Sequence, residues 1–276
     1  MRFRSPDGVV HRGVVEEGAE PACVSDTQAG LRLPLADAAA LALPEPYALL
    51  RPLDPPEVWC AGVTYERSRD ARLEEATVKD VYALVYDADR PELFLKDAAC
   101  RRTVGPGEPI GVRADAAWNV PEPELGLVLG EGGTIAGYTI GNDVSSRDIE
   151  GANPLYLPQA KVYAGACAIG PAVVDEGGPF ELCMRILGAD GAELYAGETS
   201  TARMRRSFED LVSWLVRDNP VPAGSVLLTG TGLVPPDGFT LQPGMRVEIH
   251  VPGIGTLANP VAPAAELLSE DVASSE

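Results

Sequence analysis

The sequence predicts an α+β protein that is mostly β-structure, with a small N-terminal domain ahead of one larger domain. Three observations predict this class. From Pro91 onward, short apolar segments separated by glycine and proline turns dominate the chain, which is typical of β-sheet. One segment, Ser207–Val216, carries apolar residues at helical spacing instead. The 276 residues, 45% of them apolar, suffice for one substantial core and a small appendage.

The N-terminal unit shows no visible chemistry. Its segment Val9–Val15 is typical of a strand, and the alanine-rich segment Leu35–Leu43 predicts a helix. The proline-rich stretch Pro52–Glu57 is typical of a linker. We therefore expect one domain over residues 1–55 and a catalytic domain over residues 56–276.

The catalytic domain is expected to open with a buried strand at Val58–Val63, which is almost wholly apolar. The next stretch, Thr64–Asp89, alternates acidic with basic residues and predicts one or two exposed helices, such as an active-site cover. The segments Leu125–Leu129 and Ala136–Gly141 predict neighbouring strands, joined by the turn Gly130–Gly133.

Composition excludes several classes of function. The net charge of −19 argues against nucleic acid or an anionic membrane as a partner, since both require a positive face. No stretch approaches the roughly 18 apolar residues of a membrane span, and no hydrophobic signal core follows the first residues, so we expect a cytoplasmic protein. Five scattered cysteines and two histidines predict neither a disulfide framework nor a zinc site.

Glu122 and Glu124 are the first candidates for chemistry. Residues two apart on a strand point to the same face, so their carboxylates would project together. Burying such a pair without a partner is costly, and a cation removes the cost. Taken alone, the triplet also fits a solvated strand face. The expected return of the next strand brings Asp143 to the pair, and three carboxylates suit a hard divalent cation such as Mg²⁺, Mn²⁺ or Ca²⁺.

Four blocks then follow one another: Val120-Pro-Glu-Pro-Glu124, Gly137-Tyr-Thr-Ile-Gly-Asn-Asp-Val-Ser-Ser-Arg-Asp148, Lys161 and Leu228-Thr-Gly-Thr231. Their order and spacing resemble the fumarylacetoacetate hydrolase superfamily, and the resemblance runs from about Val58 to Val261. It implies a mixed β-roll or β-sandwich catalytic domain. It also implies enzymes that act on 2-oxo acids or 1,3-dicarbonyl compounds and that assemble as homodimers or dimers of dimers.

The resemblance implies roles for individual residues. Glu122, Glu124 and Asp143 correspond to the ligands of Mg²⁺, and Lys161 to a lysine beside the metal, where its ammonium stabilises developing negative charge. An ordinary surface lysine is the alternative for Lys161. A 2-oxo acid chelates the metal through its carboxylate and keto oxygens, so the reaction is expected to pass through an enolate.

The sequence departs from the hydrolases of this superfamily on the covering segment. The resemblance implies that a histidine and a glutamate activate water in those enzymes, and Ser68 and Ala71 occupy the corresponding places here. Hydrolysis is therefore disfavoured. Instead, Gly62-Val-Thr-Tyr65, Arg90-Pro-Glu-Leu-Phe-Leu-Lys96 and Asn153-Pro-Leu-Tyr-Leu-Pro-Gln-Ala-Lys161 resemble a subgroup that includes 2-keto-3-deoxy-sugar-acid dehydratases, of the arabinonate type.

The leading hypothesis is accordingly the Mg²⁺-dependent elimination of water from a 2-keto-3-deoxy sugar acid, a hydro-lyase reaction. Glu92 is expected to deliver a proton to the departing hydroxyl at C4; an exposed residue after a proline is the alternative. Arg90 is a candidate for recognising a distal substrate group, although exposed arginines on a charged cover are commoner.

Three more residues are expected to contact the substrate. Thr229 and Thr231 follow a strand, where hydroxyl groups and backbone donors can bind a carboxylate, and a purely structural turn would look the same. Tyr65, from the motif shared with the dehydratase subgroup, is the third. Two other functions stay open: an acylpyruvase-like or fumarylacetoacetate-type C–C hydrolase or a 2-oxo-acid decarboxylase, and, in another class, an inactive metal-binding scaffold.

Overall fold

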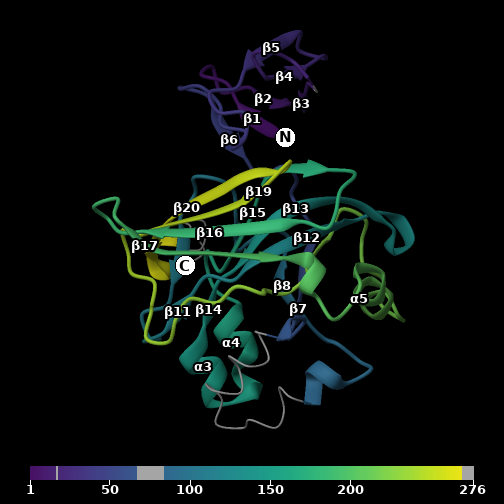
Figure 1. Ribbon diagram of the computed structural model, residues 1–276, viewed down its shortest axis with the longest axis vertical. Helices are drawn as coiled ribbons and strands as arrows, with labels where there is room; N and C mark the ends of the chain where they lie inside the picture. The colour runs from purple at the N-terminus through teal and green to yellow at the C-terminus, as the bar shows by residue number, and fades with distance from the viewer. Residues whose placement is uncertain (17, 67–83, 269–276) are drawn as a thin grey trace, which may run out of the picture.

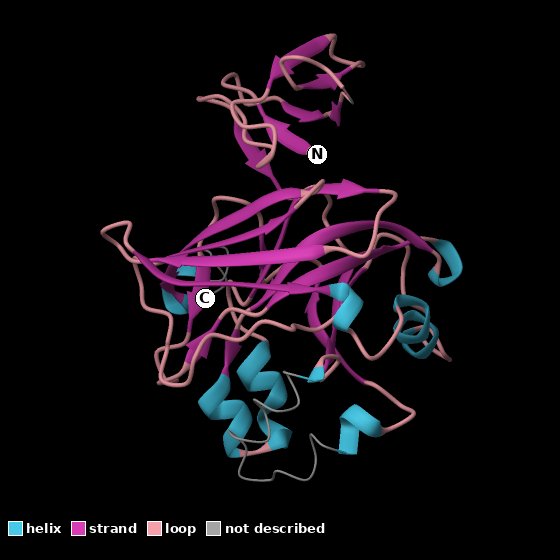
Figure 2. Cartoon of the chain, viewed as in Figure 1, coloured by secondary structure: helices cyan, strands magenta, loops and turns pink. Residues whose placement is uncertain are grey.

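The structure is a computed structural model that describes residues 1–16, 18–66 and 84–268. The predicted class is confirmed, since strands take up far more of the described chain than helices do, and the helices lie at its margins (Figure 2). Two sheets pack face to face as the main body, and smaller sheets at the N-terminus lie at one end of it (Figure 1).

The larger sheet of the body is mixed. Its strand order is β8-β7-β18-β12-β13-β15-β9; β18 runs parallel to β7 and β9 parallel to β15, while the other neighbours are antiparallel. In that order the strands are β8 (Glu92–Ala98), β7 (Glu57–Gly62), β18 (Val226–Leu228), β12 (Pro123–Leu129), β13 (Ile135–Asp143), β15 (Cys167–Val174) and β9 (Thr103–Val104).

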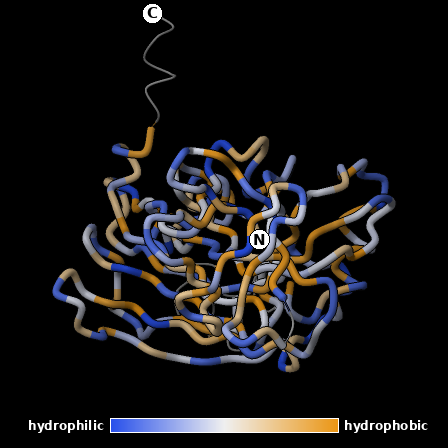
Figure 3. The backbone as a smooth tube through the Cα atoms, turned by 90° about the horizontal axis from the view of Figure 1, so that it is seen from above, coloured by the Kyte–Doolittle hydropathy of each residue, from blue (hydrophilic) through white to orange (hydrophobic). Residues whose placement is uncertain are grey.

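The second sheet of the body has the order β10-β20-β19-β16-β17. Its strands are β10 (Ile110–Val112), β20 (Gly255–Pro263), β19 (Arg246–Val251), β16 (Glu181–Leu187) and β17 (Glu193–Ser200). Side chains of both sheets form one apolar core, to which the helix α5 (Phe208–Leu215) contributes as well. Figure 3 shows apolar strand segments running through the middle of the molecule, with hydrophilic turns at the rim.

Strand β12 shows how alternate side chains are divided between the two faces of the larger sheet. Leu125, Leu127 and Leu129 belong to the core between the two sheets. Because side chains alternate along a strand, Glu124 and Val128 project to the opposite face, and Val128 packs there in a second apolar cluster. The two-residue period thus buries a leucine stripe on one side and leaves the glutamates on the other.

The remaining elements are short. The predicted helix at residues 207–216 is confirmed as α5, whose first turn is capped by Ser207: its hydroxyl accepts a hydrogen bond from the Asp210 N–H at 3.1 Å. The others are β11 (Asn119–Val120) and β14 (Ser145–Ser146), which pair with each other, α3 (Arg147–Ala152), α4 (Leu157–Lys161), and the 3₁₀ helices η1 (Glu131–Gly133), η2 (Pro154–Tyr156), η3 (Thr201–Arg203) and η4 (Ala264–Leu267).

The N-terminal residues form two three-stranded sheets, ordered β2-β1-β6 and β3-β4-β5, around a small core of their own. They lie at the end of the body opposite α3 and α4 (Figure 1). The expected strand at residues 9–15 is present but divided in two, and the boundary at residue 55 stays a prediction. The strands are β1 (Arg2–Arg4), β2 (Val10–Arg12), β3 (Val14–Val15), β4 (Cys23–Asp26), β5 (Leu31–Pro34) and β6 (Ala48–Leu50).

The predicted helix at Leu35–Leu43 is wrong. This segment is a tight turn closed by a bridge between Asp37 and Ala42. The Asp37 carboxylate accepts hydrogen bonds from the backbone N–H groups of Ala39 and Ala40, at 2.9 and 3.1 Å. An aspartate that captures nearby N–H groups competes with helical hydrogen bonding, and Leu41 with φ of 53° cannot continue a right-handed helix.

Most of the expected cover over residues 64–89 lies outside the described residues, which stop at 66 and resume at 84. The strand expected at Val58–Val63 is confirmed as β7, and the turn expected at Gly130–Gly133 joins β12 to β13. Within the described parts of the chain, no helix has the length and apolar character needed to cross a membrane.

Candidate active site

The candidate site lies at one end of the larger sheet. Strands β7, β18 and β13 run in the same direction, and β8 and β12 run against them. The last residues of the first three strands therefore meet the first residues of the other two. The helices α3 and α4 lie at this end as well, with β14 leading directly into α3 (Figure 1).

Glu122, Glu124 and Asp143 come together at this end. Asp143 is the last residue of β13, and Pro123 of β12 pairs with Asn142. The Asp143 N–H donates to the Glu122 carbonyl at 2.9 Å, and the Glu122 N–H donates to the Asn142 side chain at 3.1 Å. One ligand atom from each of the three carboxylates lies within 4.8 Å of the others. All three residues are 2% exposed.

The electrostatics of the three carboxylates fit a divalent cation. Burial, together with the negative charges of Asp143 and Glu122, raises the pKa of Glu124 well above its ordinary value. A cation held among the three groups would remove this penalty. Buried carboxylate oxygens at this spacing are the donor set that Mg²⁺, Mn²⁺ and Ca²⁺ accept.

Lys161, at the end of α4, reaches the same three-carboxylate cluster. Its ammonium donates to Glu122 Oε2 at 2.6 Å, to Asp143 Oδ2 at 2.8 Å and to the Ser145 hydroxyl at 2.5 Å. The residue is 2% exposed, so it is not a surface lysine. Its charge lies against two of the three carboxylates, and its role toward a bound substrate stays a prediction.

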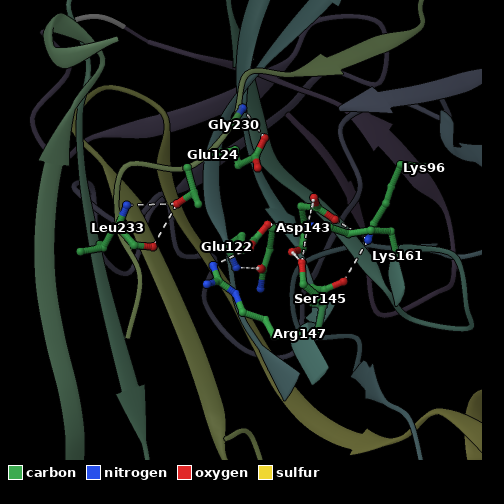
Figure 4. A network of polar contacts seen from close by, with 12 residues as sticks. Lys96, Glu122, Glu124, Asp143, Ser145, Arg147, Lys161, Gly230 and Leu233 are labelled. Carbon is green, nitrogen blue, oxygen red and sulfur yellow. Dashed lines mark hydrogen bonds and ion pairs between the residues drawn. The ribbon is translucent and has the colours of Figure 1, made fainter. Parts of the chain in front are cut away.

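Two further cations contact the cluster from outside, and sequence reasoning assigned neither of them to the site (Figure 4). The ammonium of Lys96 forms an ion pair with Asp143 Oδ1 and donates to the Val144 carbonyl at 2.9 Å. The Arg147 guanidinium donates to Glu122 Oε1 at 2.8 Å. A signal for Lys96 existed, because on β8 it shares a face with Glu92, and only the apolar residues Leu93–Leu95 separate the two.

Glu92 lines a small cavity that adjoins the three carboxylates. It pairs across the strands with Gly62 of β7. A Cβ placed on Gly62 would lie 2.0 Å from Glu92 Oε2, so the carboxylate lies across the space that this glycine leaves open. The cavity is also lined by Glu150 of α3, a buried acid that sequence reasoning missed.

The loop after β18 closes another side of the cavity. The Gly230 N–H donates to Glu124 Oε2 at 2.7 Å. Gly230 has φ of +90°, and a Cβ there would lie 2.1 Å from the Thr64 hydroxyl, so only glycine fits. Thr231 lines the cavity, and its hydroxyl bonds the backbone of Leu233.

Three predicted substrate contacts lie outside the lining of this cavity. The Thr229 hydroxyl donates to the Leu125 carbonyl at 3.0 Å and so holds the loop to β12. Tyr65 is buried, and burial followed by the charge of Glu124 raises the pKa of its phenol. Arg90 is exposed and stacks on the Trp214 ring at 4.6 Å, so the structure does not bring it to the cavity.

Two known proteins with similar sequences carry the names of dehydratases. A protein of Haloferax volcanii named "Probable 2-keto-3-deoxyxylonate dehydratase" is 56% identical over 214 residues, which cover 76% of this chain and 73% of that protein. The 2-dehydro-3-deoxy-D-arabinonate dehydratase of Saccharolobus solfataricus is 46% identical over 221 residues, covering 77% and 74%.

A solved structure of a dehydratase is similar to this chain as well. The structure described as 2-keto-3-deoxy-D-arabinonate dehydratase complexed with magnesium and 2,5-dioxopentanoate superimposes with a TM-score of 0.80 at 36% identity, over 95% of this chain and 98% of the other. The family model for the fumarylacetoacetate (FAA) hydrolase C-terminal domain matches residues 57–262, a range that contains every site residue described above. This chain therefore belongs to the fumarylacetoacetate hydrolase family.

Proposed function

We propose that this protein is a Mg²⁺-dependent hydro-lyase that removes water from a 2-keto-3-deoxy sugar acid. The observation that carries the proposal is the buried cluster of Glu122, Glu124 and Asp143, with Lys161 beside it and Glu92 across the same cavity. The similarity to two dehydratases, and to a dehydratase structure that is complexed with magnesium, supports the choice of reaction and metal.

The reaction class follows from the chemistry of these side chains. Mg²⁺ bound by the three carboxylates supplies a positive charge that polarises the 2-oxo group and acidifies the C3 proton. The Lys161 ammonium adds a fixed positive charge for the negative charge that develops when that proton leaves. Such preorganised charges in a buried site need no reorganisation during the reaction.

Elimination also needs an acid for the leaving group. We propose that the Glu92 carboxylate takes the C3 proton and then donates it to the C4 hydroxyl, which departs as water as the C3–C4 double bond forms. Its placement across Gly62 and in the cavity lining supports this role. The Thr231 backbone and its neighbours in the loop after β18 are proposed to contact the substrate carboxylate.

Hydrolysis remains the alternative reaction of the same site. It requires a base that activates water, and the sequence has Ser68 and Ala71 at the places where a histidine and a glutamate are expected in the hydrolases. Both positions lie outside the described residues. The argument against hydrolysis therefore depends on the chemistry of the two side chains, because neither a hydroxyl nor a methyl group is a base.

The test is a product analysis by mass spectrometry. The purified protein with Mg²⁺ is incubated with 2-keto-3-deoxypentonate and, separately, with acetylpyruvate. We expect the sugar acid to lose the mass of one water and acetylpyruvate to persist, and we expect the Glu124→Ala variant to convert neither. Cleavage of acetylpyruvate would establish a hydrolase instead, and no turnover of any 2-oxo acid would favour the inactive scaffold.

Location and assembly are part of the proposal. We propose a cytoplasmic protein, which its five free cysteines support, because reducing compartments keep thiols reduced. We propose a homodimer or a dimer of dimers on the resemblance to family members. Sedimentation of the purified protein tests the assembly, and a monomer at micromolar concentration would contradict it.

A further inference from the structure

A second cavity, of about 280 Å³, lies between the helix α5 and the strands β7 and β8. Its described lining residues all differ from those of the cavity beside the three carboxylates. Part of the lining is apolar and comes from Trp59 of β7, Leu93 of β8 and Leu215 of α5. Leu93 pairs with Ala61, two residues beyond Trp59, so the side chains of Trp59 and Leu93 project from the same face of the sheet.

Two arginines supply the charge of this second cavity. Arg90 precedes β8, Arg217 follows α5, and both are exposed. Their Cζ atoms lie 4.6 and 3.8 Å from the centroid of the same Trp214 ring. A guanidinium that lies over an aromatic ring uses its face, so the N–H donors at its edge stay available. The Trp214 ring therefore holds two guanidinium groups without occupying their hydrogen bonds.

Neither of these guanidinium groups has an acidic partner in the part of the chain that the structure describes. Their neighbours differ in this respect. In the adjoining cavity, Arg205 pairs with Asp87 at 3.4 Å, and Arg206 pairs with Asp210 at 2.9 Å. Two like charges over one ring repel each other. An anionic ligand would remove this repulsion and accept hydrogen bonds from the available N–H donors.

The two parts of the lining indicate a class of ligand. A guanidinium binds a carboxylate through two parallel N–H···O bonds, so two guanidinium groups accommodate two carboxylates. The apolar surface of Trp59 and Leu93 favours carbon atoms over a wholly polar anion such as phosphate. Sites for small molecules have volumes of roughly 300–1,000 Å³. A cavity of about 280 Å³ therefore fits a ligand of only a few carbon atoms.

We propose that this second cavity is a ligand site that binds a small organic dicarboxylate between Arg90 and Arg217. The site lies next to the proposed acid–base residue. Leu93 lines the second cavity, whereas the preceding Glu92 points to the opposite face of β8 and lines the cavity beside the three carboxylates. The proposal concerns binding and does not depend on which reaction the protein catalyses.

The test is calorimetric titration of the whole protein, in the presence of Mg²⁺, with glutarate as the probe. Glutarate has two carboxylates and no 2-oxo group, so it cannot form the chelate that is expected of a substrate at the metal. We expect one glutarate to bind per chain, with the same affinity in the Glu124→Ala variant. Absence of binding to the wild-type protein would overturn the proposal. Binding that Glu124→Ala abolishes would overturn it too, because the probe would then lie at the metal.

Arg90→Gln and Arg217→Gln each remove one guanidinium from an exposed position. We expect the Kd for glutarate to rise about tenfold or more with either variant, the effect of losing a hydrogen bond to a charged group. Arg205→Gln is the matched control, because it removes the same charge from the adjoining cavity and should leave the Kd nearly unchanged. Equal rises in all three variants would reveal only a general attraction to positive charge and would reject the proposal.

Two further anions test the class of ligand on the wild-type protein, and this comparison is decisive even if a variant does not fold. Propionate has a single carboxylate, and inorganic phosphate has no carbon chain. We expect both to bind more weakly than glutarate. Propionate binding as tightly as glutarate would exclude a role for the second guanidinium, and phosphate binding as tightly would exclude a dicarboxylate site.

Discussion

At the scale of single residues, the cost of burying charge explains how the site is built. Each buried ion costs several kcal/mol in desolvation, so it persists only with a well-placed partner. Lys96, Arg147 and Lys161 each contact at least one carboxylate of the cluster. Glu124 accepts a hydrogen bond from the Gly230 N–H. The pKa of Glu124 is nevertheless raised, which indicates that this one hydrogen bond does not offset the cost of burying the Glu124 charge. The cluster is therefore prepared for one more cation.

Glu92→Gln tests the proposed acid at this scale. The amide keeps the size of the side chain but has no acidic proton, so we expect kcat for dehydration to fall by about 10²- to 10⁴-fold. Mg²⁺ affinity should be unchanged, because Glu92 is not among the three metal-binding candidates. Steady-state kinetics and calorimetry measure the two quantities, with Glu131→Gln in an exposed turn as the control. A smaller loss of kcat would remove Glu92 from the role.

At the scale of elements, strand pairing decides which side chains can meet. The register of β7 against β8 places Gly62 opposite Glu92, and the register of β12 against β13 brings Asp143 to Glu122. A shift of either pair by one residue would turn these groups to the other face of the sheet. Chemistry at this site thus depends on hydrogen bonds of the backbone as much as on the acids themselves.

Gly62→Ala tests the contact between β7 and β8. The new methyl group would occupy the space of the Glu92 carboxylate, so we expect a loss of kcat comparable with that of Glu92→Gln, with Mg²⁺ affinity retained. Kinetics of the double variant provide the control. If the glycine acts through Glu92, combining the two changes adds little, because the two residues share one effect. Additive losses would show that Gly62 acts in another way.

The cap of α5 gives a prediction about stability alone. Ser207→Ala removes the hydroxyl that accepts from the Asp210 N–H, and we expect the free energy of unfolding to fall by about 1 kcal/mol. Ser213→Ala, on the same helix, should be neutral or slightly stabilising because alanine is the better helix former. Urea unfolding measures both. Equal effects of the two variants would contradict a capping role for Ser207.

At the scale of the whole molecule, the two ends of the body carry different parts of the structure. The site lies where β7, β13 and β18 end, and the N-terminal sheets lie at the opposite end (Figure 1). Glu124 and Asp143 come from two strands joined by η1, Glu122 directly precedes the first of these strands, and Lys161 follows on the short helix α4. A cation at this point would connect segments that lie apart in the sequence.

Metal binding should accordingly stabilise the entire fold. A ligand that binds only the native state adds about 2.7 kcal/mol when it is present at about 100 times its Kd. We expect Mg²⁺ to raise the Tm in a concentration-dependent manner and EDTA to reverse the rise, as followed by circular dichroism. The Glu124→Ala variant should show no Mg²⁺-dependent rise. An equal rise in that variant would show that the metal binds elsewhere.

Much of this arrangement could be predicted from the sequence, because it depends on local patterns. The alternation along β12 placed Glu122 and Glu124 on one face, and the turn at residues 130–133 returned Asp143 to them. The segment at Leu35–Leu43 shows where such reasoning fails. Its alanines favour a helix, but one aspartate captures the backbone N–H groups that a helix would need.

The sequence by itself determined the class of fold, the family resemblance and the identity of the acidic cluster, since strand periodicity and motif spacing are properties of the chain. Only the tertiary structure showed that Lys96 and Arg147 join Lys161 around the cluster. Lys96 and Arg147 reach Asp143 and Glu122 through the pairing of separate strands and the start of α3. These contacts depend on the direction from which each cation approaches a buried carboxylate, and that direction exists only in the folded protein.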